Sequence, residues 1–209
     1  MVMRVKLLIF SHPLCAFRRV VLSRTSAGPT IKWMTEAAVI TVSDSCSRGQ
    51  RVDLSGPAVA TELATHGFDV KLRLLVADER KAIEDALRTA ANAVPLVVTT
   101  GGTGISRRDV TPEATREVCS RLLEGVSEMI RSEGRKETPF AALSRAVCGT
   151  VSAEGSADYS EALVLNLPGS PQGAVTSLRV AMPLVKHALQ LLAGNLQHDL
   201  NSEKSEETN

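Results

Sequence analysis

Hydrophobic and polar positions alternate along the chain in blocks that predict strands followed by helices. Three short apolar runs, 37–42, 95–100 and 162–167, have the composition of strands buried on both faces. An alternating run at 70–76 predicts another strand. Apolar residues at helical spacing predict helices between and after these strands. These helices are expected at 55–66, at 78–91, from 111 onward, at 126–144 with a break near Pro139, and at 175–192.

The order of these segments indicates a three-layer α/β fold, with a mostly parallel sheet covered by helices on both faces. A weaker strand is expected at 145–151. Ligands of such sheets bind at the carboxyl ends of the strands. Polar or glycine-rich segments follow three of the strands, at 43–44, 101–109 and 168–171. We therefore expect these segments to lie together and to form one site.

Three of the predicted helices begin at side chains that typically cap a helix. Ser55, Asp78 and Thr111 each stand where the polar pattern gives way to helical spacing. For Asp78, capping is the safer interpretation from the residues alone. Asp44 is equally suited to accept hydrogen bonds from loop amides.

The ends of the chain differ from its body. Residues 1–33 contain six basic residues and no acidic one, whereas the whole chain of 209 residues has a net charge of only +1. This leader is either an organellar transit peptide or the result of a translation start that really lies at Met34, which we favour. We expect one domain at 34–196 and a disordered polar tail at 197–209.

Composition argues against several classes of function. Aromatic residues make up 3% of the chain, which is few for a surface that stacks single-stranded nucleic acid, and the body is mildly acidic, unlike a duplex-DNA binder. The leader's apolar run is too short to span a membrane. The cysteines form no Cys-x-x-Cys pair, so we expect no structural zinc and no disulfide framework, but free thiols in a cytoplasmic protein. No histidine is assigned a catalytic role.

The glycine-rich segment after the strand at 95–100 is the strongest candidate for a binding loop. Its residues are Thr100, Gly101, Gly102, Thr103 and Gly104. Glycines let the backbone turn sharply, and successive N–H groups can form a concave anion site. The segment matches neither the P-loop nor the dinucleotide-binding fingerprint. Taken alone, it is equally consistent with a plain tight turn.

The charged residues after this loop add to the case. Arg107 and Arg108 are candidates for phosphate binding, and Asp109 is a candidate ligand for Mg²⁺. Each alone is more often a solvated loop charge. Their position beside an anion loop at a strand end favours the functional interpretation.

Four segments in the same order resemble the molybdopterin adenylyltransferases of the MoaB/Mog family, to which the G domain of gephyrin is related. The segments are 100–104, 108–114, 143–145 and 166–171, and the resemblance extends over about 36–195. It implies a role in molybdenum cofactor biosynthesis. The implied reaction is adenylylation of molybdopterin by ATP with Mg²⁺, with release of pyrophosphate. A homotrimer is also implied.

The resemblance also implies roles for individual residues. Asp109 and Asp78 are the expected catalytic residues, with Mg²⁺ on Asp109, either alone or together with Asp78 or Asp44. The substrate-binding residues are expected to be Ser43, Asp44, Thr100, Gly101, Gly102, Thr103, Gly104, Arg108, Ser144, Arg145, Pro168, Gly169 and Ser170. The segment at 152–160 is longer and more polar than is usual in the family, so a serine that contacts the pterin stays unassigned there.

Two other interpretations remain open. One is a family member that binds a pterin or nucleotide without adenylylating it, and the other is a trimeric scaffold module. The run at 109–113, which some relatives lack, is present here and favours the enzyme. No long linker or second domain supports the scaffold.

Overall fold

The computed structural model describes residues 35–154, 156 and 158–194. The leader at 1–33, including the choice between a transit peptide and a start at Met34, and the tail at 197–209 lie outside the described residues.

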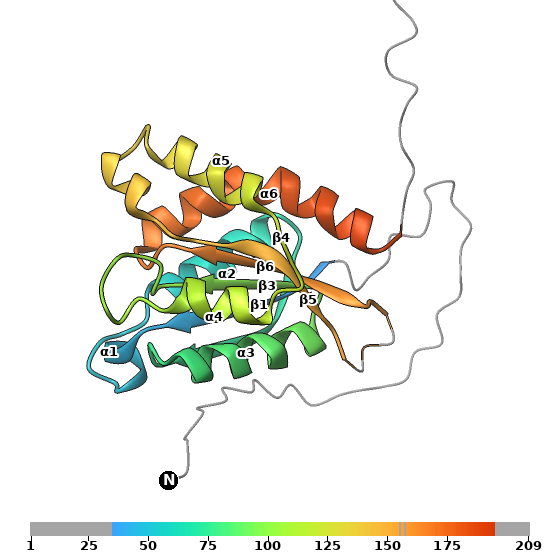
Figure 1. Ribbon diagram of the computed structural model, residues 1–209, viewed down its shortest axis with the longest axis horizontal. Helices are drawn as coiled ribbons and strands as arrows, with labels where there is room; N and C mark the ends of the chain where they lie inside the picture. The colour runs from blue at the N-terminus through green and yellow to red at the C-terminus, as the bar shows by residue number, and fades with distance from the viewer. Residues whose placement is uncertain (1–34, 155, 157, 195–209) are drawn as a thin grey trace, which may run out of the picture.

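Six strands form one mostly parallel sheet with helices on both faces (Figure 1). The strands are β1 (Glu36–Val42), β2 (Asp69–Val76), β3 (Leu96–Thr100), β4 (Arg121–Leu122), β5 (Cys148–Ser152) and β6 (Glu161–Leu167). Their order is β2-β1-β3-β6-β5-β4, and the first four of these are parallel. β5 is antiparallel to β6 and β4 is antiparallel to β5. The predicted three-layer α/β fold is confirmed.

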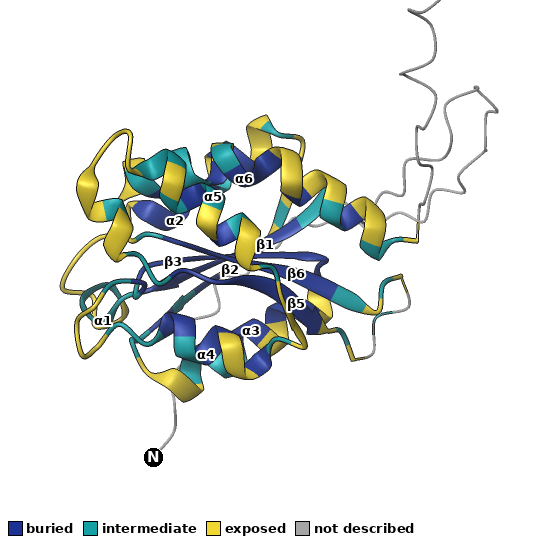
Figure 2. Cartoon of the chain, turned by 45° about the horizontal axis from the view of Figure 1, so that its top comes forward, coloured by how far each residue is buried: buried dark blue, intermediate teal, exposed yellow. Residues whose placement is uncertain are grey.

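The helices divide between the two faces of the sheet. They are α1 (Asp44–Ser47), α2 (Ser55–Thr65), α3 (Arg80–Ala93), α4 (Thr111–Val118), α5 (Glu124–Gly134), a 3-10 helix (Pro139–Leu143) and α6 (Pro171–Leu192). α2, α5 and α6 contribute to one buried cluster, and α3 and α4 contribute to the other. Figure 2 shows the buried strands between these two helical layers.

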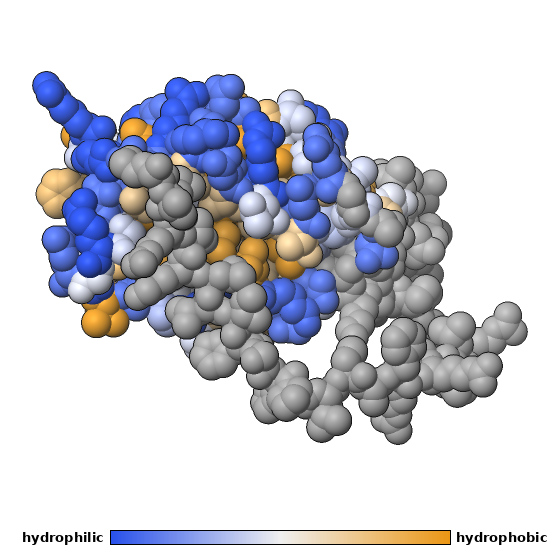
Figure 3. Space-filling model, turned by 90° about the horizontal axis from the view of Figure 1, so that it is seen from below, coloured by the Kyte–Doolittle hydropathy of each residue, from blue (hydrophilic) through white to orange (hydrophobic). Residues whose placement is uncertain are grey.

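The double-sided burial explains why the strands are continuous apolar runs. Ala37 and Val39 of β1 belong to one core cluster, whereas Ala38, Ile40 and Val42 belong to the other. Successive side chains of a strand point to opposite faces, so a strand covered on both faces needs an apolar residue at each position. Figure 3 shows one face of the molecule, which is hydrophilic toward its edges and has hydrophobic residues gathered at its middle.

The predicted element positions hold with small shifts. The strand expected at 145–151 begins later, at Cys148, and the segment expected to be helical at 126–144 consists of α5 and the 3-10 helix, on either side of the expected break. The two-residue strand β4 and the single helical turn α1 have no counterpart among the predictions. Among the described helices, none is long and apolar enough to cross a membrane.

None of the three predicted capping side chains caps its helix, so those predictions were wrong. Ser55 lies inside α2, and the carboxylate of Asp53 accepts a hydrogen bond from the Gly56 N–H at 2.9 Å instead. Thr111 begins α4 as predicted, but its hydroxyl donates to the Gly101 carbonyl at 2.9 Å. Asp78 precedes α3 without capping it, because its carboxylate is bound by a residue of another loop.

Candidate active site

The segments that follow β1, β3 and β6 meet at one edge of the sheet, as predicted. The Gly101 N–H donates to the Leu167 carbonyl at 3.2 Å, and the Thr100 hydroxyl donates to the Pro168 carbonyl at 2.8 Å. A Cβ atom on Gly169 would lie 3.3 Å from the Gly101 Cα atom. The loop after β6 is therefore packed directly on the glycine loop.

The glycine loop is both a tight turn and a candidate anion site. Gly101 and Gly102 have φ values of 102° and 63°, in the left-handed region that favours glycine. A Cβ on Gly101 would clash with the Val42 carbonyl of β1, so the close packing of this loop requires glycine. The carbonyls of Gly102 and Thr103 accept hydrogen bonds from other backbone groups. The N–H groups of Gly102, Thr103 and Gly104 have no acceptor among the described residues, which leaves three donors for an anion.

Two pockets adjoin this loop and meet at Gly102, Asp109 and Gly169, which line both. The larger pocket, about 480 Å³, lies between the glycine loop, α5, the 3-10 helix and the start of α6. The smaller pocket, about 280 Å³, lies between the end of β1, the loop before α2 and Asp78. A site with two compartments that share one carboxylate can hold two ligands with their reacting ends together.

Eleven of the fifteen predicted site residues line these pockets. The smaller pocket includes Ser43, Asp78, Gly101, Gly102, Asp109 and Gly169. The larger pocket includes Gly102, Thr103, Gly104, Asp109, Ser144, Pro168, Gly169 and Ser170. The remaining four, which line neither pocket, are Asp44, Thr100, Arg108 and Arg145.

Asp44 and Asp78 form a reciprocal pair. The Asp44 N–H donates to Asp78 Oδ2 at 2.7 Å, and the Asp78 N–H donates to Asp44 Oδ1 at 3.2 Å. Burial raises the pKa of Asp78; the hydrogen bond from Asp44 and the charge of Arg108 oppose this rise, whereas the negative charges of Asp44 and Asp109 add to it. Asp78 is thus a carboxylate that a bound cation would stabilise.

Asp109 occupies the junction of the two pockets. Its Oδ2 atom accepts a hydrogen bond from the Ser106 N–H at 2.8 Å, and a Cβ on Gly104 would lie 2.9 Å from the same oxygen. Its Oδ1 atom has no donor within the described part of the chain. One carboxylate oxygen therefore fixes the side chain, and the other is free for a ligand.

The guanidinium of Arg108 is bound by acidic side chains, and Arg108 lines neither pocket. Its guanidinium donates to both carboxylate oxygens of Asp44 at 3.0 Å and to Glu79 at 2.9 Å. These carboxylates raise the pKa of Arg108 further, so it stays charged. Bidentate pairing with Asp44 ties the segment after the glycine loop to the start of α1.

The guanidinium of Arg145 is likewise bound by other groups of the protein. Its Nε and Nη2 atoms donate to the carbonyls of Gly104 and Asp109 at 2.6 and 2.5 Å, and its Nη1 atom pairs with Glu113. Its backbone N–H donates to the Thr103 carbonyl at 3.0 Å. The guanidinium thus ties the end of the glycine loop to Asp109 and to α4.

Sequence reasoning missed several residues of both pockets. Arg51 and Asp53 line the smaller pocket, and Ile105, Arg131 and Phe140 line the larger one. Arg51, Asp53 and Ile105 lie in loops near the predicted motifs, whereas Arg131 lies in α5 and Phe140 in the 3-10 helix, and no motif includes any of them. Phe140 and Ile105 are 75% and 70% exposed, which is unusual for large apolar side chains and marks the mouth of the larger pocket.

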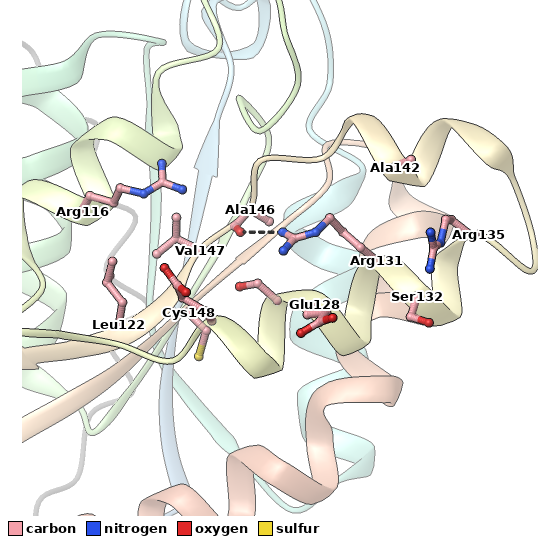
Figure 4. Close-up of a pocket in the computed structure, with 12 residues that line it drawn as sticks. Arg116, Leu122, Glu128, Arg131, Ser132, Arg135, Ala142, Ala146, Val147 and Cys148 are labelled. Atoms are coloured by element: carbon pink, nitrogen blue, oxygen red, sulfur yellow. Dashed lines mark hydrogen bonds between the residues drawn. The ribbon is translucent and has the colours of Figure 1, made fainter.

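Another pocket, about 540 Å³, lies apart from the predicted residues (Figure 4). Arg116, Arg131 and Arg135 line it together with Glu124 and Glu128. Arg116 and Arg135 lie at opposite ends, and Arg131 between them donates to the Ala146 carbonyl at 3.4 Å. The arginines do not converge on one point and are mixed with acids, so this pocket does not have the character of a single anion site.

The described residues contain no group of three or more His, Cys, Asp or Glu side chains that could enclose a metal ion. Mg²⁺ bound to nucleotides usually takes only one or two carboxylates, and substrate phosphates complete its shell. Asp78 and Asp109 line the same pocket, and each has a carboxylate oxygen without a donor among the described residues. Both oxygens of Asp44 are already taken. The donor set fits Mg²⁺ on Asp78 and Asp109 rather than on Asp44.

Comparison with known proteins gives consistent matches. The model of a family described as a probable molybdopterin binding domain matches residues 38–187. A molybdopterin adenylyltransferase of Helicobacter pylori strain J99 is 37% identical over 161 residues, covering 75% of this chain and 87% of that protein. The solved structure of the molybdopterin biosynthesis enzyme MoaB of Thermus thermophilus is 41% identical, with a TM-score of 0.68 over 77% of this chain and 97% of that one. The tungsten cofactor synthesizing protein MoaB of Pyrococcus furiosus is 30% identical, with a TM-score of 0.65 over 76% and 97% of the two chains.

Proposed function

Since the chain belongs to the molybdopterin-binding family whose model spans residues 38–187, we propose that it adenylylates molybdopterin in molybdenum cofactor biosynthesis, with ATP as the second substrate. The observation that carries this proposal is the position of Asp109, at the point where two pockets meet beside the glycine loop. An adenylyl transfer between two bound substrates requires such a meeting point. The name of the Helicobacter pylori relative supports the same reaction.

In the proposed reaction, a terminal phosphate oxygen of molybdopterin attacks the α-phosphorus of ATP. A new phosphorus–oxygen bond forms, and the bond from the α-phosphorus to the oxygen that bridges to the β-phosphorus breaks. Pyrophosphate leaves with the electron pair of that bond. Because the nucleophile is already an anionic phosphate, the protein needs no general base, and its contribution is positioning and charge stabilisation.

The residues of the site fit these two tasks. The three unpaired N–H groups of the glycine loop are suited to hold one phosphate group by its oxygens. Asp78 and Asp109 are suited to hold Mg²⁺, which when bound to the phosphates would neutralise the charge that develops on the leaving group. Arg145 and the Asp44–Arg108 pair hold the loop that carries Asp109. Their role in this proposal is to keep the Asp109 carboxylate in place.

The setting of the reaction is part of the proposal. We place it in the cytoplasm, because Cys46, Cys119 and Cys148 are free thiols in the described chain. We also propose a homotrimer, in line with the family resemblance and with exposed large apolar side chains such as Phe140 and Leu143. Analytical ultracentrifugation tests the trimer.

Product formation tests the proposed function directly. Purified protein is incubated with molybdopterin, ATP and Mg²⁺, and the adenylylated product and pyrophosphate are measured. Equal amounts of both are expected. Binding of molybdopterin without either product, by protein with intact secondary structure, would instead identify a non-adenylylating pterin binder.

A further inference from the structure

The smaller pocket raises a charge problem under the proposed function, on which this inference rests. It is lined by Asp78 and Asp109, yet it adjoins the loop where a substrate phosphate is expected. Phosphate and carboxylate groups repel each other unless cations lie between them. Mg²⁺ held by Asp78 and Asp109 would supply part of the required positive charge, and transfer sites of this kind also use a side-chain cation on the phosphates.

None of the three arginines singled out from the sequence supplies this cation; Arg107 lines neither pocket. Arg108 is bound by Asp44 and Glu79, and Arg145 is bound by Glu113 and by two carbonyls of the glycine loop. Neither lines the pocket. Using either for substrate would break several charge-assisted hydrogen bonds that hold Asp109 in position.

Arg51 is the one arginine or lysine among the described residues that line the smaller pocket. Its side chain has no hydrogen bond or ion pair within the described part of the chain, in contrast to Arg108 and Arg145. A guanidinium that is free of acidic partners and lines a pocket with three carboxylates, those of Asp53, Asp78 and Asp109, is placed to bind an anion that enters there.

The backbone around Arg51 is fixed although its side chain is free. The N–H groups of Gln50 and Arg51 donate to the Ser45 carbonyl at 2.8 and 3.2 Å. Two residues later, Asp53 accepts hydrogen bonds from the Thr41 hydroxyl at 2.7 Å and from the Gly56 N–H at 2.9 Å. The loop is therefore tied to the end of β1 and to the start of α2, so the guanidinium is presented from a defined position.

The larger pocket has no unpaired arginine or lysine among the described residues that line it. Arg131 lines it, but the guanidinium of Arg131 donates to the Ala146 carbonyl and also lines the separate pocket of Figure 4. Of the two arginines that line these pockets, Arg51 is thus the one without a side-chain partner among the described residues. We propose that Arg51 binds a substrate phosphate group in the smaller pocket and is the phosphate-binding arginine of this site.

Kinetics of three variants test this proposal. Arg51→Gln removes the charge, Arg51→Lys keeps the charge without the bidentate geometry, and Arg88→Gln is the control, because Arg88 is an exposed arginine of α3 that lines neither pocket. For Arg51→Gln we expect KM to rise about tenfold or more for one substrate, as expected for loss of a charge-assisted contact. Arg51→Lys should recover part of this loss, and Arg88→Gln should match the wild type. Whether the KM for ATP or for molybdopterin rises identifies whose phosphate Arg51 binds.

A binding measurement separates this proposal from the proposed function. Inorganic pyrophosphate is titrated calorimetrically into the wild type, Arg51→Gln and Arg88→Gln, each shown by thermal unfolding to be folded. At least tenfold weaker binding to Arg51→Gln alone supports the role of Arg51 even if the wild type forms no adenylylated product. Equal pyrophosphate affinity and equal KM values in Arg51→Gln and Arg88→Gln overturn it, even if the wild type is fully active.

Discussion

Asp44 and Asp78 are joined by two hydrogen bonds, each from the backbone N–H of one residue to the carboxylate of the other, at 2.7 and 3.2 Å. They are separated by 34 positions in the sequence and lie at the ends of the neighbouring parallel strands β1 and β2. Asp44 also holds Arg108 in a bidentate pair. One carboxylate therefore positions a second carboxylate of the site and the segment that carries Asp109.

Replacing Asp44 should reduce turnover without removing a substrate contact. In Asp44→Ala the Asp78 N–H loses its acceptor and Arg108 loses its bidentate partner, so kcat should fall while KM changes little. The free energy of unfolding should fall only slightly, since the Arg108 guanidinium is exposed to solvent. Steady-state kinetics and urea unfolding measure both. A large rise in KM with unchanged kcat would assign Asp44 to substrate binding instead.

Arg145 should likewise affect turnover by holding Asp109 and the glycine loop in position. Arg145→Lys keeps a positive charge but cannot reach Gly104, Asp109 and Glu113 together. We expect kcat to fall at least tenfold with little change in KM, and the free energy of unfolding to fall by roughly 1–2 kcal/mol. If Arg145→Lys lost substrate affinity and kept kcat, the bracing role would be refuted.

Gly104 offers a test of how closely Asp109 is packed. A methyl group at Gly104 would lie 2.9 Å from Asp109 Oδ2 and would displace this carboxylate. Gly104→Ala should therefore lower kcat with little loss of stability, because Gly104 is not in the left-handed region. Gly125→Ala in α5 is the matched control, since a Cβ there meets no atom within 4 Å. Wild-type turnover in Gly104→Ala would show that Asp109 tolerates displacement.

Stability at acidic pH should depend on an ion pair between α2 and α6. Glu62 is buried, and the Arg179 guanidinium bonded to both of its oxygens at 2.8 Å is the main cause that holds its pKa below the ordinary value of 4.5. Because the folded-state pKa of Glu62 is lowered, the stability that the ion pair adds is fully present above pH 4.5. It is lost as the pH falls through the folded-state pKa. Urea unfolding from pH 7 to pH 3 should show a shallower loss of stability in Glu62→Gln than in the wild type. Identical pH profiles would exclude this ion pair as a source of acid sensitivity.

The fold and the place of the site follow from the sequence because they depend on local pattern. Strand β3 consists of five apolar or threonine residues in succession, and this pattern predicts burial on both faces. The glycine loop follows β3 directly. The carboxyl ends of parallel strands lie at the same edge of the sheet. Ser43, Asp109 and Gly169 can therefore be assigned to one site from the sequence alone.

The partners of individual side chains do not follow from the sequence, because residues far apart decide them. Asp78 has the pattern of a helix cap, but the competing donor is the N–H of Asp44. Arg108 has the pattern of a phosphate ligand, but two carboxylates occupy it. Arg51, in contrast, has no motif around it and faces the pocket only because the loop from Gly49 to Asp53 folds back on Ser45.

The most direct test of the central claim compares adenylylation by the wild type and by Asp109→Asn. The substitution keeps the size of the side chain and an oxygen that can accept the Ser106 N–H, so the thermal unfolding temperature should stay close to that of the wild type. With molybdopterin, ATP and Mg²⁺, the wild type should release pyrophosphate and form adenylylated molybdopterin, and Asp109→Asn should form at least a hundredfold less per unit time, on the order of the loss expected when a group at the reacting centre is removed. Wild-type rates in folded Asp109→Asn, or no product from the wild type, would contradict the account.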